Sequence, residues 1–149
     1  MAAVAWSLLG ILGGMLVAVQ APVNAALAKG LGLSVAAAAV SFTVGAVVLT
    51  LVTAVTVAAS GISLDWRAPA PWLFVAGGVL GAGFVTSTTV LTPRLGAAAV
   101  MAFLVAGQLI AGMLVDRAGL LGVAVREISL GRIAGALLLL AGALLIRLT

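Results

Sequence analysis

The sequence predicts an all-α membrane protein with five membrane-spanning helices. Of its 149 residues, 65% are hydrophobic and only 7% are charged, which is too little charge to cover the surface of a soluble domain. The ten charged residues (seven Lys/Arg plus three Asp/Glu) all lie in the gaps or at the ends of five long apolar runs. A hydrocarbon core of about 30 Å needs about 20 helical residues per crossing. Five crossings therefore use most of the chain, and we expect a single transmembrane domain over 1–149.

The five apolar runs set the expected spans. The first run lacks the basic start of a signal peptide and is too long for one, so we expect it to be retained as a span. Ser34 is the expected N-cap of the second run. The spans, in order, are expected over about 4–28, 34–60, 72–92, 97–115 and 133–146.

The connections between the runs differ in character. The stretch 61–71 carries two prolines and three polar or charged residues beside Trp66, so it is expected to leave the bilayer. The widest gap, 116–131, mixes charges with many aliphatic residues and is predicted to be a short interfacial segment. The last span is short, and Arg132 and Arg147 are expected to anchor its ends.

The positive charges divide almost evenly between the two faces that these spans imply. The N-terminal face receives Arg67, Arg117, Arg126 and Arg132, and the opposite face receives Lys29, Arg94 and Arg147. Four against three is a weak bias under the positive-inside rule, and it favours a cytoplasmic N-terminus. We interpret the near tie as access to both orientations; a chance tie among few charges is the alternative. The three tryptophans all fall on the N-terminal face, as in an interfacial belt.

Uncharged polar side chains are the candidates for binding a solute. Gln20 and Asn24 share one helix face, and Pro22 between them removes a backbone donor and should bend or loosen the helix. Carboxamides in lipid need partners, which either a wet cavity or a neighbouring helix supplies. We favour cavity lining for this pair.

Further candidates lie on the second, third and fourth runs. Thr86 begins the stretch 86–89 of four hydroxyl residues, which also suits neutral packing. Gln108 lies near mid-span and suits a ligand contact or a bond between helices equally. Ser41 and Phe42 open a polar stretch, where Phe42 faces either lipid or a pocket. In an antiparallel pair of chains, Gln108 of one copy would come near the level of Gln20 and Asn24 of the other.

Other features suit packing or coupling. Asp116 is the one carboxylate adjoining a span, and it suits an interfacial ion pair or helix-end contact, with proton coupling as the minority interpretation. Gly131, Gly135 and Gly142 share one helix face and allow close approach of a second helix, so they are our candidates for dimer packing.

Several classes of function are disfavoured. The chain has no cysteine and no histidine, so we expect no disulfide, no metal site and no cofactor. No nucleophile–base arrangement points to an enzyme. The net charge of +4 comes from residues flanking the spans, and no basic patch supports nucleic-acid binding.

Motifs along nearly the whole chain resemble the YdcZ-type inner-membrane exporters, a bacterial family of the drug/metabolite transporter superfamily. They are Gln20-x-x-x-Asn24, Ser41-Phe42-x-x-Gly45, Pro71-Trp72 before Gly77-Gly78-Val79-Leu80-Gly81, Pro93-Arg94-Leu95-Gly96, Gly107-Gln108, Asp116 with Gly119-Leu120-Leu121-Gly122, and Arg132-x-x-Gly135. The resemblance implies five-helix units that occur singly, in pairs or fused. Its relatives include small multidrug-resistance transporters, which are antiparallel dimers. It also implies the bacterial inner membrane, and Gln20, Asn24, Ser41 and Gln108 as first choices for lining a site.

The chain departs from the family pattern at three places. Arg117-Ala118 replaces an aromatic residue after Asp116, and Leu73 replaces a second tryptophan. The first span also lacks the glutamate of the multidrug-resistance relatives, so proton-coupled cation export by that route does not carry over.

These observations predict a small-solute transporter that works by alternating access as an antiparallel, dual-topology homodimer. Its expected partners are the lipid bilayer, a small-molecule substrate and a second copy. The main alternative is a non-transporting membrane subunit, or half of a heteromeric transporter or assembly. A passive channel is a weaker alternative, because the polar side chains lie at separate depths rather than in one stripe.

Overall fold

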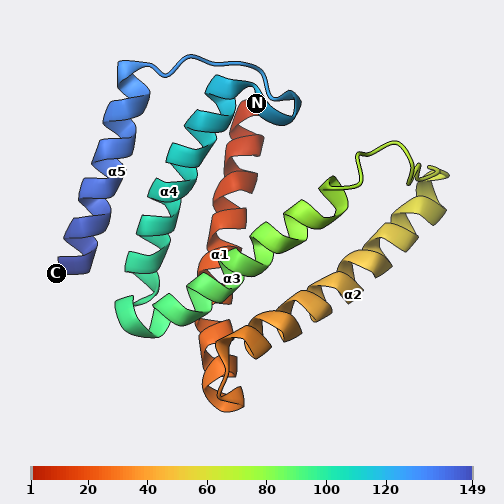
Figure 1. The fold of residues 1–149 in the computed structure, drawn as a ribbon, viewed down its shortest axis with the longest axis horizontal. Coiled ribbons are helices and arrows are strands. Elements are labelled where there is room, and N and C mark those ends of the chain that lie inside the picture. The colour runs from red at the N-terminus through yellow and green to blue at the C-terminus, as the bar shows by residue number, and fades with distance from the viewer. Residues whose placement is uncertain (1, 149) are drawn as a thin grey trace. The chain divides into compact units, whose positions relative to one another are not determined.

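The computed structural model describes residues 2–148, and over this range it confirms an all-helical chain with five long apolar helices (Figure 1). Each of the five is long and apolar enough to cross a membrane. The helices are α1 (Ala2–Leu31), α2 (Ser34–Ser60), α3 (Leu73–Leu95), α4 (Ala97–Ala118) and α5 (Leu130–Leu148), and the short 3-10 helix η1 (Leu120–Gly122) follows α4.

α2 has its expected bounds, whereas the other four helices end beyond the expected spans, because a helix can continue into the headgroup region after the hydrocarbon ends. The last one shows this best. Its expected span, 133–146, is short for a crossing, whereas α5 has 19 residues. At about 1.5 Å per residue this length is close to the thickness of the hydrocarbon core. Arg132 and Arg147 then lie inside the first and last turns of α5.

Glycines in the left-handed conformation follow several of the helices, and those after α2 and α4 act as C-caps. Gly61 and Gly119 follow α2 and α4 with φ of 67° and 61°, a left-handed conformation that favours glycine. Their backbone N–H groups donate to the carbonyls of Val57 and Val115, which closes the last helical turn.

The expected N-cap at Ser34 is wrong. The N-cap of α2 is Leu33, which is extended (φ −147°, ψ 117°) and makes no side-chain capping bond. α1 ends at Leu31, and only two residues, Gly32 (φ of 77°) and Leu33, connect it to α2. Ser34 therefore falls inside the first turn of α2 instead of before it.

The chain divides into two compact units, Met1–Pro93 and Arg94–Thr149. Within the first unit α1 packs on α2, and within the second α4 packs on α5. Their buried apolar residues are mostly alanines, which allow two helix backbones to approach closely. They are Ala21, Ala28, Ala37 and Ala38 in the first unit, and Ala99, Ala106, Ala136 and Ala143 in the second. Whether the chain acts as one transmembrane domain stays a prediction.

Most of the apolar helix surface is exposed. The most apolar stretch of α1 has a mean hydropathy of 1.8, yet none of its residues is buried. Large side chains such as Leu8, Leu16 and Val19 lie on the surface of α1. Water cannot cover such a surface at acceptable cost, so lipid or another membrane-embedded chain must cover it.

Candidate functional site

Asn24 is a buried hydrogen-bond donor with no acceptor. Its side chain is 3% exposed, and Nδ2 makes no hydrogen bond. The other buried residues of α1 and α2 are alanines, whose side chains offer no acceptor. A buried amide left unsatisfied costs about 1–3 kcal/mol. Within residues 2–148, Nδ2 of Asn24 is thus a buried donor without an acceptor, and its role in binding a solute stays a prediction.

Pro22 adds a second unsatisfied group close by. α1 continues through Pro22, which has no N–H, so the carbonyl of Ala18 loses its usual helical donor. The buried amide of Asn24 and the carbonyl that lacks its usual helical donor thus lie about two turns apart on the same helix. Gln20, four residues before Asn24, is exposed. The buried residues of α1, where it packs on α2, begin at Ala21, one position after Gln20.

Most hydroxyls of α3 are already bonded to their own helix. Their bonds satisfy the donors, so these side chains favour packing over ligand binding. The bonds run from Ser87 to the carbonyl of Gly83 (2.8 Å), from Thr88 and Thr89 to that of Val85 (2.9 and 2.8 Å), and from Thr92 to that of Thr88 (2.7 Å). Within residues 2–148, the hydroxyl of Thr86 makes no such bond, so it remains free to bind a ligand.

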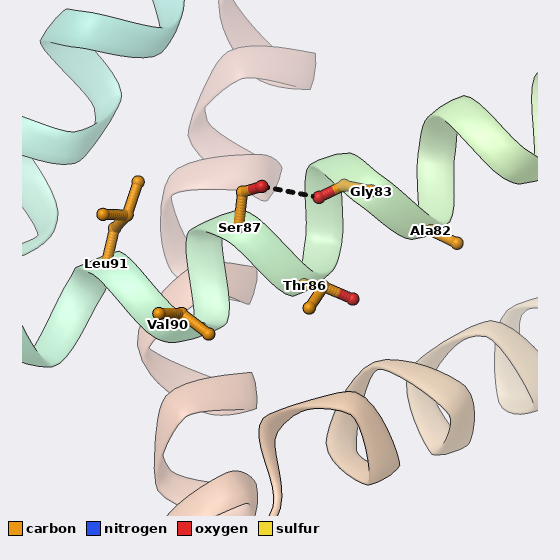
Figure 2. A pocket seen from close by; sticks show the side chains of 6 residues that line it. All are labelled: Ala82, Gly83, Thr86, Ser87, Val90 and Leu91. Atoms are coloured by element: carbon orange, nitrogen blue, oxygen red, sulfur yellow. Dashed lines mark hydrogen bonds between the residues drawn. The ribbon is translucent and has the colours of Figure 1, made fainter.

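Thr86 also lines a groove of about 580 Å³ along α3 (Figure 2). Thr86 and Ser87 project toward opposite edges of the helix, and of the two only Ser87 donates a hydrogen bond to a backbone carbonyl, that of Gly83. The other lining residues are small or apolar: Ala82, Gly83, Val90 and Leu91. The groove therefore offers one free hydroxyl within a mainly apolar wall.

Phe42 contacts α3 rather than pointing only into the surroundings. Its side chain is 37% exposed, and its ring lies against Gly81: a Cβ added there would stand 2.9 Å from Cζ of Phe42. Ser41, the preceding residue, is half-buried. Phe42 thus occupies the place where α2 meets α3, with part of its ring still accessible. Phe42 as a pocket wall stays a prediction.

Gln108 lies on α4 in the second unit and is exposed. Over the part of the chain described, neither Gln20, Ser41 nor Gln108 hydrogen-bonds another candidate residue. The structure thus places each polar side chain on its helix without joining them into one network. A site formed by all of them stays a prediction.

The glycine face of α5 has open space beside it. A Cβ at Gly135 or Gly142 would meet no atom within 4 Å, and one at Gly131 would meet only the hydroxyl of Ser129, at 3.9 Å. Gly142 also lines an apolar groove of about 300 Å³ between α4 and α5. The groove's other residues are Met101, Ala102, Val105, Leu138, Leu139, Ala143 and Ile146.

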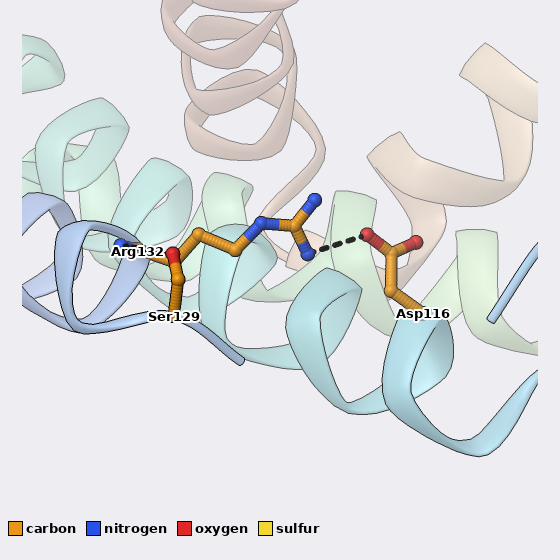
Figure 3. Close-up of polar contacts among 3 residues, drawn as sticks. All are labelled: Asp116, Ser129 and Arg132. Atoms are coloured by element: carbon orange, nitrogen blue, oxygen red, sulfur yellow. Dashed lines mark hydrogen bonds and ion pairs between the residues drawn. The ribbon is translucent and has the colours of Figure 1, made fainter. Parts of the chain in front are cut away.

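Asp116, the candidate for proton coupling, is held in an ion pair (Figure 3). Arg132 Nη1 lies 3.0 Å from Oδ2 of Asp116, with 30% and 29% of the two side chains exposed. Ser129 fixes the start of α5, since its hydroxyl accepts a hydrogen bond from the backbone N–H of Arg132 (3.3 Å). The contact joins the end of α4 to the start of α5. A coupling role for Asp116 stays a prediction.

The cap at Ser129 and the partner of Asp116 were not foreseen, although an ion pair was the main interpretation of Asp116. Ser129 caps α5, and a serine just before an apolar run is a sequence signal for this. The pairing of Asp116 with Arg132 had no such signal, because 15 residues separate the two in the sequence. Only the return of the connection to the end of α4 brings them together.

The five long apolar helices define a multi-pass α-helical membrane protein. A family model described as "Putative inner membrane exporter, YdcZ" matches residues 5–145. The chain belongs to this family. No curated protein and no solved structure matches the chain.

Family membership confirms the resemblance drawn from the motifs and gives the chain's location, the inner membrane, which its five apolar helices cross. The description of the family is that of an inner-membrane exporter. The partners that follow are the lipid bilayer and a small substrate.

Proposed function

We propose that the protein moves a small polar solute across the inner membrane by alternating access between two inverted copies. The buried amide of Asn24 is the observation that carries this proposal. A buried donor without a hydrogen bond destabilises the packed part of a membrane helix. A substrate that presents an acceptor to Asn24 would remove this destabilisation when it binds. Gln20, Ser41, Phe42, Thr86 and Gln108 are the proposed further contacts.

The substrate we propose is neutral or carries locally paired charge. Every Lys, Arg, Asp and Glu lies in a connection or near a helix end. An ionic substrate would therefore find no side chain of opposite charge near the middle of the membrane. Asn24 would donate to a carbonyl, hydroxyl or ether oxygen of the solute, and the carbonyl of Ala18, which lacks its usual helical donor because of Pro22, would accept from a hydroxyl or amide. Such a solute needs no metal or cofactor to be held.

Two inverted copies would complete the site and create the two states. The four-to-three division of basic residues favours neither orientation strongly. The open glycine face of α5, at Gly135 and Gly142, offers a surface for a second copy. In such a pair the outward-open and inward-open states are related by a two-fold axis in the membrane plane, so neither is favoured intrinsically.

The test combines binding with stability. Purified protein in nanodiscs is screened by thermal shift against small neutral solutes, and the solutes that raise the melting temperature are then tested for uptake into proteoliposomes. Asn24→Leu should abolish the solute-induced shift. Because it removes an unsatisfied donor, it should leave the melting temperature of the solute-free protein unchanged or higher.

Thr56→Val is the matched control. Its hydroxyl bonds to the carbonyl of Val52 on the exposed part of α2, so its removal should leave the solute response intact. If Asn24→Leu instead lowers the solute-free melting temperature and keeps the solute shift, Asn24 is a packing residue and the proposed site is wrong.

A further inference from the structure

The connection between α4 and α5, residues 119–129, exposes aliphatic side chains on a segment that is mostly not helical. The most exposed of them, Leu121, has 71% of its surface accessible. The others are Leu120, Val123, Val125 and Ile128. Five large apolar side chains on a segment this short indicate a surface that water does not cover.

The backbone of this connection sets the depth at which it can lie. Leu121 has a φ of 58°, and the chain is irregular from Val123 until α5 begins at Leu130. Few of its backbone groups pair with one another, so it cannot lie in the hydrocarbon core facing lipid. Its side chains, in turn, are too apolar for water. Both requirements are met in the headgroup region, where the backbone is hydrated and the side chains reach the acyl chains.

A backbone hydrogen bond brings Arg126 close to Arg117. The N–H of Arg126 donates to the carbonyl of Asp116 (3.0 Å), which returns Arg126 to the end of α4 beside Arg117. The carboxylate of Asp116 is already paired with Arg132. Within residues 2–148, Arg117 and Arg126 are exposed and form no ion pair, and Glu127 beside them is exposed as well.

The shape of the connection is fixed by Gly119. Its φ is 61°, and a Cβ there would stand 2.7 Å from Cγ2 of Val125. Val125 therefore folds back over the end of α4, one residue before Arg126. Together with the hydrogen bond from Arg126, this close approach places both arginines at the end of α4.

We propose that the 119–129 connection is a binding site for anionic phospholipid: its aliphatic side chains enter the bilayer interface, and Arg117 and Arg126 bind the lipid phosphate. The occupant is a phospholipid because the same segment presents apolar side chains for acyl chains and guanidinium groups for a phosphate. This site goes beyond transport and does not depend on the proposed solute.

Native mass spectrometry of the detergent-solubilised protein, titrated with phosphatidylglycerol and separately with phosphatidylcholine, tests the charge requirement. The loss of one arginine near a membrane surface weakens the affinity for anionic lipid about five-fold. Arg117→Gln with Arg126→Gln should therefore weaken retention of phosphatidylglycerol by at least ten-fold. Retention of phosphatidylcholine should not change.

Two further variants make the outcome decisive. Glu127→Gln removes the local negative charge and should strengthen phosphatidylglycerol binding, a gain that misfolding cannot produce. Arg67→Gln with Arg147→Gln removes the same total charge elsewhere and should have a much smaller effect. Equal losses from the two arginine pairs, or no gain from Glu127→Gln, overturns the proposal.

The depth of the segment has its own measurement. Since the chain has no cysteine, Leu121→Cys can carry a single environment-sensitive fluorophore. In phosphatidylglycerol liposomes its emission should shift to the blue and be quenched by brominated lipid, whereas the same label at Ala68→Cys, in the α2–α3 connection, should remain in water. If the fluorophore on Leu121→Cys gives the spectrum of a label in water, the segment does not enter lipid. If its emission shifts to the blue but brominated lipid does not quench it, the label lies against protein. Either result contradicts the lipid site.

Discussion

The ring of Phe42 lies against the backbone of Gly81, so that a Cβ at Gly81 would stand 2.9 Å from Cζ and 3.3 Å from Cε1 of the ring. Through this contact α2 meets α3 within the first unit. The absence of a side chain at residue 81 is therefore what lets the aromatic ring approach α3. Phe42 was predicted as a candidate from its place in the sequence, but its partner was not.

Gly81→Ala and Gly77→Ala test this contact as a pair. Both substitutions should gain about 0.5–1 kcal/mol of helix propensity. Only Gly81→Ala forces the Phe42 ring to move, so its free energy of unfolding should be lower than that of Gly77→Ala by about 1 kcal/mol. A Phe42→Ala background should remove the difference. Equal stabilities of the two alanine variants in the wild-type background would show that the ring does not pack there.

Thr86 and Ser87 are adjacent, yet their hydroxyls should behave differently. Thr86→Val removes a free donor that lines the α3 groove and should weaken binding of an active solute about two- to ten-fold, the value of one hydrogen bond. Ser87→Ala removes a hydroxyl bonded to Gly83 and should leave binding unchanged. Solute titrations followed by thermal shift measure both. An equal loss in the two variants would remove Thr86 from the site.

The ion pair between Asp116 and Arg132 should stabilise the second unit only slightly. A double-mutant cycle with Asp116→Asn and Arg132→Gln should give a coupling energy of about 0.2–1 kcal/mol, as expected for a partly exposed pair. Its measurement is thermal or denaturant unfolding of the two single variants and the double variant. A coupling energy near zero would show that the pair does not hold α4 to α5 in solution.

The same variants separate packing from proton coupling. If Asp116 carries the coupled proton, Asp116→Asn should abolish uptake driven by a pH gradient while Arg132→Gln retains it. Identical uptake by the two variants would leave Asp116 with its helix-connecting role alone.

The five helices could be predicted from the sequence because their determinants are local. Apolar runs of sufficient length, interrupted only by charge, proline and glycine, define where a chain can cross lipid. Gly61 and Gly119 end α2 and α4 where the runs stop. The prediction failed at Ser34, because the short connection of Gly32 and Leu33 makes Leu33 the N-cap and places Ser34 inside the helix.

The site could be predicted only in part, because burial depends on which helices pack. Gln20 and Asn24 are both carboxamides on one helix face, yet Gln20 is exposed and Asn24 is buried. That distinction comes from where α2 covers α1. The sequence also could not separate Thr86 from the hydroxyls beside it, since all can bond to their own helix.

Orientation in the membrane tests the central claim most directly. Single cysteines at Leu33 and Ser63 stand at opposite ends of α2, whose 27 residues span about 40 Å, and the native chain has no cysteine to interfere. An impermeant thiol reagent is applied to intact cells and then to opened cells. Two inverted copies predict that each position is labelled partly from outside and partly from inside. If Leu33→Cys reacts from one side alone and Ser63→Cys only from the other, the protein has a single orientation and the inverted pair is contradicted.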